Sequence, residues 1–169
     1  MEMKKFTRLS LLLALSVALN IIESSLPLFN GFIPGLKLGL ANIVSLFVIY
    51  EFGLKDALYV GILRVFLVGI LRTGLFSTTF FFSLAGVLLS IIIMYIGKKY
   101  LKLSIIGVSI IGSIAHSVGQ IMVAIALLQM KTMIYYLPWL LLFAIPTGIL
   151  VGIICKQLVN YYNEHLIIE

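Results

Sequence analysis

The sequence predicts an all-α, polytopic membrane protein with six transmembrane helices, and three observations support this fold class. The chain has 169 residues, of which 62% are hydrophobic and only 11% are charged, and its mean hydropathy is +1.21. Apolar segments close to the roughly 20 residues needed to cross a bilayer recur along its whole length. None of them shows β-type alternation, and a backbone in lipid must satisfy its own hydrogen bonds, so helices are predicted.

The apolar segments form a single predicted domain over residues 1–169, because the chain is too short to carry a separate soluble domain of ordinary size. The second segment is short for a membrane span. The predicted helices cover residues 6–25, 38–52, 55–72, 77–97, 104–128 and 134–156. The single cysteine, Cys155, excludes a disulfide within one chain.

Lysine and arginine residues predict the orientation of the helices. The richer side holds Lys4, Lys5, Arg8, Lys55, Lys98, Lys99, Lys102 and Lys156, and the other side holds Lys37, Arg72 and Lys131. The richer side of a membrane protein normally faces the cytoplasm. Both termini are therefore expected in the cytoplasm, and the loops at 26–37, 72–77 and 129–134 are expected outside.

Polar side chains from separate helices lie at one predicted depth, in the outer half of the membrane. The candidate ligand-binding residues are Asn20, Glu23, Lys37, Asn42, Arg64, Arg72, His116 and Gln120. Polar groups at this depth are costly unless they are paired or hydrated. A pore would need a polar lining throughout, so a pocket open to the outside is expected instead. The two arginines and Lys37 favour an anionic ligand such as a carboxylate or a phosphate.

Three of these features also have a purely structural interpretation. Arg64 can bond to backbone carbonyls or to Glu23, and His116 can be a packing residue of the bundle. The first outward loop, over residues 26–36, can close the top of the bundle or act as a lid over a ligand. We favour the ligand-binding interpretation for Arg64 and for the loop, and leave His116 open between the two.

The first predicted helix carries small residues at a spacing of four. Ser10, Ala14 and Ala18 form a flat stripe that another helix can approach closely. The stripe can pack within the protein's own bundle, or it can dock a separate membrane protein.

Catalytic chemistry is not expected of this chain. Polyprenyl diphosphate synthesis needs aspartate-rich clusters to hold Mg²⁺, and Asp56 is the single aspartate. The sequence has no nucleophile motif, no metal-ligand spacing and no P-loop. We therefore expect no catalytic residue, metal or cofactor. No basic run with interleaved aromatic residues occurs, so nucleic acid is not expected as a partner.

Four stretches carry a resemblance to a known family. They are Lys37-Leu38-Gly39-Leu40-Ala41-Asn42-Ile43, Arg64 in the third helix, Ser83-Leu84-Ala85-Gly86 in the fourth, and Ala115-His116-Ser117-Val118-Gly119-Gln120 in the fifth. Over nearly its whole length the chain resembles the Gx transporter family, also labelled heptaprenyl diphosphate synthase component I. That family is similar to the substrate-binding S components of energy-coupling factor (ECF) transporters, which are six-helix proteins that capture vitamins from outside.

The resemblance also implies partners and a ligand class. The first helix of S components carries an Ala-x-x-x-Ala stripe that meets a transmembrane coupling subunit, and Ala14 and Ala18 match that stripe. The coupling subunit in turn joins two cytoplasmic ATPases. Some relatives are encoded near flavin or quinone electron-transfer genes, which implies a flavin- or quinone-related ligand.

The expected function is therefore that of a multi-pass cell-membrane protein that binds a substrate. It would take up a small anionic or vitamin-like metabolite through an ECF-type transporter. The expected partners are a small-molecule ligand from the outer face, the coupling subunit with its ATPases, and the lipid bilayer. The alternative is a non-catalytic scaffold subunit of a flavin or quinone electron-transfer complex, or of a heptaprenyl diphosphate synthase complex.

Overall fold

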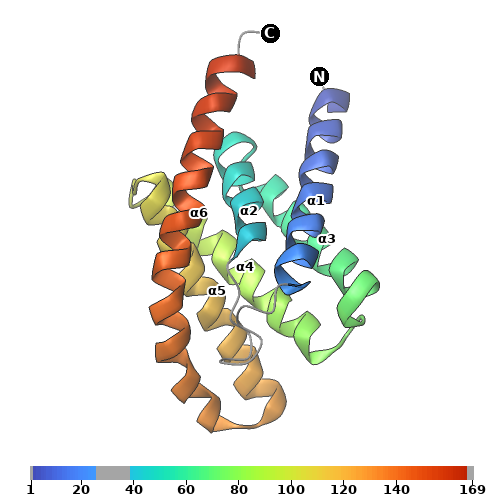
Figure 1. The fold of residues 1–169 in the computed structure, drawn as a ribbon, viewed down its shortest axis with the longest axis vertical. Coiled ribbons are helices and arrows are strands. Elements are labelled where there is room, and N and C mark those ends of the chain that lie inside the picture. Colours follow the sequence, from blue (N-terminus) through green and yellow to red (C-terminus); the bar gives the residue numbers. More distant parts are fainter. Residues whose placement is uncertain (1, 26–38, 167–169) are drawn as a thin grey trace.

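The computed structural model describes residues 2–25 and 39–166, and these residues form six α-helices (Figure 1). The α-helices are α1 (Glu2–Ser25), α2 (Leu40–Glu51), α3 (Leu54–Val68), α4 (Thr78–Lys99), α5 (Ile105–Leu128) and α6 (Leu137–Leu166). A π-helical turn, η1 (Gly69–Thr73), follows α3, and a 3₁₀ helix, η2 (Lys131–Tyr136), precedes α6. The all-α class is confirmed, since the described residues contain no strand.

The number of helices was predicted correctly, but their lengths differ from the prediction. Among the described residues, four helical stretches are long and apolar enough to cross a membrane, namely Met3–Ser25, Thr78–Lys99, Ile105–Leu128 and Lys131–Glu164. By length and composition, the described residues therefore support four membrane spans and not the six that were predicted. With 12 residues, α2 is about 18 Å long, which is shorter than the roughly 30 Å of hydrocarbon in a bilayer.

The short helix α2 lies at the centre of the bundle. It contacts α1, α3, α4 and α6, and every residue from Ala41 to Ile49 is buried. A helix that is apolar on all sides is covered either by lipid or by neighbouring helices, and α2 is covered by its neighbours. At its C-terminal end, the ammonium group of Lys98 donates hydrogen bonds to the carbonyl oxygens of Ile49 (2.9 Å) and Tyr50 (3.1 Å). These bonds satisfy carbonyls that have no partner within the helix.

Both termini lie at one end of the bundle, at the top of Figure 1. An ion pair of 2.7 Å joins Lys5 of α1 to Asp56 of α3 at this end. Nearby, Arg8 of α1 donates a 2.8 Å hydrogen bond to the hydroxyl of Tyr162 of α6. The turn between α5 and α6 lies at the opposite end of the figure.

Helices α4 and α5 approach each other closely through small residues. The hydroxyl of Ser90 donates a 2.9 Å hydrogen bond to the carbonyl oxygen of Gly112. A Cβ atom at residue 119 would lie only 2.8 Å from the carbonyl oxygen of Ala85. The glycines of α5 therefore admit α4, which fixes the position of the α5 face that carries His116.

Candidate functional site

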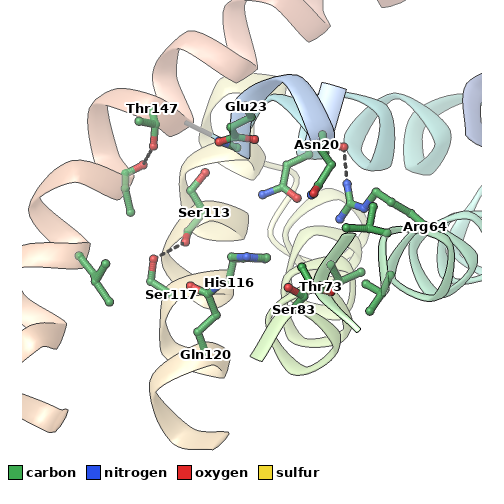
Figure 2. Close-up of a pocket in the computed structure, with 18 of the residues that line it drawn as sticks. Asn20, Glu23, Arg64, Thr73, Ser83, Ser113, His116, Ser117, Gln120 and Thr147 are labelled. Carbon is green, nitrogen blue, oxygen red and sulfur yellow. Dashed lines mark hydrogen bonds between the residues drawn. The ribbon is translucent and has the colours of Figure 1, made fainter. Parts of the chain in front are cut away.

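A cavity of about 60 Å³ lies where all six α-helices converge (Figure 2). Its polar lining comprises Asn20 and Glu23 of α1, Asn42 of α2, Arg64 of α3, Thr73 of η1, Ser83 of α4, Ser113, His116, Ser117 and Gln120 of α5, and Thr147 of α6. Most of these residues lie in the halves of their helices nearest to η1 and η2. Such convergence is the arrangement expected of a binding site within a helix bundle.

Six of the eight candidate residues line this cavity. They are Asn20, Glu23, Asn42, Arg64, His116 and Gln120. Arg72 is not among the lining residues. Lys37 and the loop over residues 26–36, which is predicted to act as a lid, lie outside the described residues.

Arg64 is the charged residue buried most deeply in the described chain, with 3% of its surface exposed. Its Nη1 atom donates a 2.6 Å hydrogen bond to the carbonyl oxygen of Ala41 and a 3.4 Å bond to the hydroxyl of Ser16. Its Nε and Nη2 atoms donate to no group within the described residues. The guanidinium therefore has both a structural role and donors that remain available for a ligand.

Glu23 lies in the same cavity and balances part of the charge of Arg64. Its side chain is buried, and it interacts electrostatically with Arg64. One carboxylate oxygen accepts a 2.5 Å hydrogen bond from the backbone N–H of Gly39, the residue before α2. Gly39 has a φ of 76°, a left-handed conformation that glycine adopts without strain. Glu23 thus holds the start of α2 beside the cavity, where a carboxylate also suits the helix dipole.

Arg72 stabilises a helix end instead of lining the cavity. Its guanidinium donates hydrogen bonds to the carbonyl oxygens of Ile21 (3.0 Å) and Ser24 (2.8 Å) and to the hydroxyl of Ser25 (3.4 Å). These groups belong to the C-terminal end of α1, where the carbonyl of Ser24 lacks a partner within the helix, while the carbonyl of Ile21 also accepts a 2.8 Å bond from the hydroxyl of Ser25. The part of the prediction that counted two arginines toward an anionic ligand therefore rests on Arg64 alone.

His116 lies across the backbone of α4 at Gly86. A Cβ atom at residue 86 would lie 2.9 Å from Cε1 of the imidazole and 3.0 Å from Nδ1. The absence of a side chain at this position therefore leaves space for the ring. In Figure 2 the ring points into the space between α5 and the side of the cavity where Arg64 lies.

Asn20 contributes an amide to the same space. Its Oδ1 atom is buried and has no hydrogen-bond partner within the described residues. A buried polar atom in this state is costly unless water or a ligand bonds to it. A second group in the cavity, besides Arg64, thus remains available for a ligand.

Sequence reasoning missed several lining hydroxyls, among them Ser83, Thr147 and the pair on α5. Ser113 and Ser117 share one helix face with His116 and Gln120, at spacings of three and four residues. That periodicity was present in the sequence and indicates a common face. Thr147 donates hydrogen bonds to the carbonyls of Phe143 (3.0 Å) and Ala144 (3.2 Å), next to Pro146, and no comparable pattern marks it in the sequence.

The stripe on α1 lies on the outside of the bundle. Ser10, Ala14 and Ala18 are all exposed, together with the larger side chains of Leu11 and Leu15. The stripe therefore does not pack within the protein's own bundle.

The described residues contain no group of three or more His, Cys, Asp or Glu side chains that could hold a metal ion. Instead, the cavity offers hydrogen-bond donors and acceptors around one buried guanidinium. Its volume is enough for roughly four water molecules, or for a polar group of similar size.

A match to a family model shows to which protein family the chain belongs. The family model described as heptaprenyl diphosphate synthase component I matches residues 12–158. The chain belongs to this family. The match covers all of the cavity residues named above. No curated protein and no solved structure matches the chain. The family description places heptaprenyl diphosphate synthase component I proteins among the components of a synthase.

Proposed function

We propose that the protein is a membrane-embedded binding protein that takes a small polar or amphipathic molecule from the outer side of the cell membrane. In this role it acts as the S-component-like subunit of an ECF-type transporter and is not itself an enzyme. The observation that carries the proposal is Arg64, which is buried at a cavity while Nε and Nη2 of its guanidinium have no hydrogen-bond partner among the described residues. An intramembrane arginine in this state suits a ligand whose acceptors satisfy its free donors.

The proposal includes both termini in the cytoplasm, with α2 enclosed by the bundle. The short helix α2 is covered by other helices, so it does not need to span the hydrocarbon against lipid. The basic residues Lys5, Arg8 and Lys98 gather at the end of the bundle that also holds the termini. By the positive-inside rule this end faces the cytoplasm.

Aromatic residues directly before α6 and in its first turn support the assignment of the opposite end of the bundle to the outer face of the membrane. Tyr135, Tyr136 and Trp139 are exposed at the end opposite the termini. Such residues are typical of the membrane–water interface. The cavity lies nearer to this end, which supports entry of the ligand from outside.

The exposed stripe of Ser10, Ala14 and Ala18 supports a docking role for α1. In the proposed transporter this face meets a transmembrane coupling subunit, which is bound to cytoplasmic ATPases. Small residues at a spacing of four allow a partner helix to approach closely, and the stripe is uncovered.

The family description favours a second candidate function. In that reading the protein is a non-catalytic membrane subunit that anchors a prenyl diphosphate synthase, or an electron-transfer complex that uses flavins or quinones. The single aspartate, Asp56, pairs with Lys5 at the end of the bundle that holds the termini, which suits an accessory role better than Mg²⁺-dependent catalysis.

The experiment that tests the proposed function combines affinity capture with uptake. The tagged protein is purified from its native membranes in mild detergent, and its partners are identified by mass spectrometry. Capture of a coupling subunit with its ATPases supports transport, whereas capture of a soluble prenyl synthase or a flavoprotein supports the scaffold. Uptake of the co-purified small molecule is then measured in cells with and without the gene. Unchanged uptake would contradict the transport role.

A further inference from the structure

A second and larger cavity adjoins the polar one. It has a volume of about 290 Å³ and lies between α4, α5 and the segment from η2 into α6. Its lining is mostly apolar and includes Phe82, Ile121, Ala124, Leu128 and Met133. We call this cavity the apolar chamber.

Three residues belong to both cavities. Ser83 of α4, Gln120 of α5 and Leu140 of α6 line the polar cavity and the apolar chamber alike. In Figure 2, Glu23 and Gln120 lie at opposite ends of the labelled residues. Because Gln120 also lines the apolar chamber, the chamber adjoins the polar cavity at the Gln120 end. The two spaces are therefore neighbours, with polar groups at one end and apolar side chains at the other.

The volumes of the two spaces differ in a way that bears on the ligand. A polar cavity of about 60 Å³ is too small for a drug-sized or vitamin-sized molecule, since ligand pockets usually measure roughly 300–1,000 Å³. The chamber is about twice the size of a cavity of roughly 150 Å³ that is known to hold benzene in another protein. Most of the available space is thus apolar.

We propose that the two cavities form one site for an amphiphile, with its polar head beside Arg64 and its apolar body in the chamber. The inference rests on the proposed function, because it assigns the ligand class of the same site. The head carries an acceptor, such as a carboxylate, for the Nε and Nη2 donors of Arg64 that no described residue accepts from. Glu23 limits the net charge that the site can balance. The body is a chain of about ten carbons or a pair of rings.

Straight-chain carboxylates are the probes for the test, because they keep one head and vary only the body. Dissociation constants for propanoate and decanoate are measured with the protein in phosphatidylcholine nanodiscs. Ala124→Leu fills the chamber, since Ala124 is buried against it. Ala126→Leu makes the same change two residues away, on an exposed part of α5. Comparing each variant with the wild type for one probe cancels the partitioning of that probe into lipid.

If the site binds an amphiphile, Ala124→Leu should weaken decanoate binding about tenfold or more and propanoate binding less than about twofold. The substitution adds three carbons that occupy the space of the decanoate chain, and each displaced CH₂ group lowers the affinity roughly fourfold. Ala126→Leu changes neither constant. If Ala124→Leu folds poorly, Ile121→Ala enlarges the chamber instead, and it is expected to raise the affinity for dodecanoate relative to decanoate.

Two results would overturn this inference. One is an equal effect of Ala124→Leu and Ala126→Leu on decanoate. The other is a phosphatidylcholine molecule retained in native mass spectra that decanoate does not displace, because the chamber would then be a lipid site. Arg64→Gln separates the two proposals. This substitution should weaken the binding of propanoate and of decanoate by the same factor. Unchanged dissociation constants for both probes would contradict the binding role of the polar cavity, whatever the chamber holds.

Discussion

Arg64 of α3 donates a 2.6 Å hydrogen bond from Nη1 to the carbonyl oxygen of Ala41, in the first turn of α2. This bond fixes the start of the central helix and leaves Nε and Nη2 of Arg64 without a protein partner among the described residues. Glu23 approaches the same turn from α1 through the N–H of Gly39. The polar cavity is thus built around the entry to α2.

Replacement of Arg72 tests whether it stabilises the C-terminal end of α1. Arg72→Ala removes three hydrogen bonds to the last turn of α1, the turn that also carries Glu23. Because Arg72 is exposed, we expect a loss of about 1 kcal/mol or less and a thermal midpoint lower by a few degrees. Thermal unfolding in detergent measures the change. Lys131→Ala, another exposed cation near the same end, is the control and should leave the midpoint unchanged.

Replacement of Gly86 tests the fit of the His116 ring. The added Cβ of Gly86→Ala would lie 2.9 Å from Cε1 of His116, so the ring must move. We expect destabilisation of about 1–3 kcal/mol and weaker ligand binding. Gly107→Ala is the matched control on α5, because its Cβ would meet neighbours only at ordinary contact distances of 3.4 Å or more. The control should be neutral or slightly stabilising. Equal unfolding midpoints for the two variants would contradict the packing described for His116.

Cysteine labelling tests the orientation of the bundle. In a Cys155→Ala background, Lys131→Cys should react with a membrane-impermeant maleimide on intact cells, because residue 131 lies at the predicted outer end. Lys4→Cys should react only after the membrane is permeabilised. Both positions are exposed, so accessibility within the protein does not limit the reaction. Labelling of Lys4→Cys on intact cells would reverse the assigned topology.

The α1 stripe predicts a defect in partner binding without a defect in folding. Ala14→Trp places a large side chain on the exposed face of α1, and we expect it to abolish co-purification of the partner subunit. Ala126→Trp, on an exposed part of α5, is the control and should retain the partner. Ligand binding should be the same in both variants, because neither residue lines the polar cavity or the apolar chamber. Full retention of the partner by Ala14→Trp would show that it docks elsewhere.

The sequence predicted the meeting of Arg64, His116 and Gln120 because depth in a membrane can be counted along helices of alternating direction. The structure does not bring Arg72 to the polar cavity. On a continuous α-helix, residues eight apart lie within roughly 80° around the axis, so Arg72 would point to a side similar to that of Arg64. The π-helical turn Gly69–Thr73 changes the rotation per residue, and nothing in the sequence marked that turn.

The role of α2 was only partly predictable. Its apolar composition identified a buried or membrane helix, but not its place at the centre of the bundle, which depends on contacts with four other helices. The apolar chamber was not predicted at all. A cavity is the space that side chains fail to fill, and residues such as Ala124 and Ile121 look like ordinary packing residues in a sequence.

The central claim is that a ligand completes the hydrogen bonding of Arg64, and its most direct test is the small molecule that leaves the purified protein on denaturation. Mass spectrometry of the released material compares the wild type with Arg64→Gln and with Arg72→Gln, which removes the same charge outside the cavity. We predict one defined small molecule, in near-equal amount to the protein, from the wild type and from Arg72→Gln, and its loss from Arg64→Gln. The same molecule recovered in full from Arg64→Gln would contradict the account.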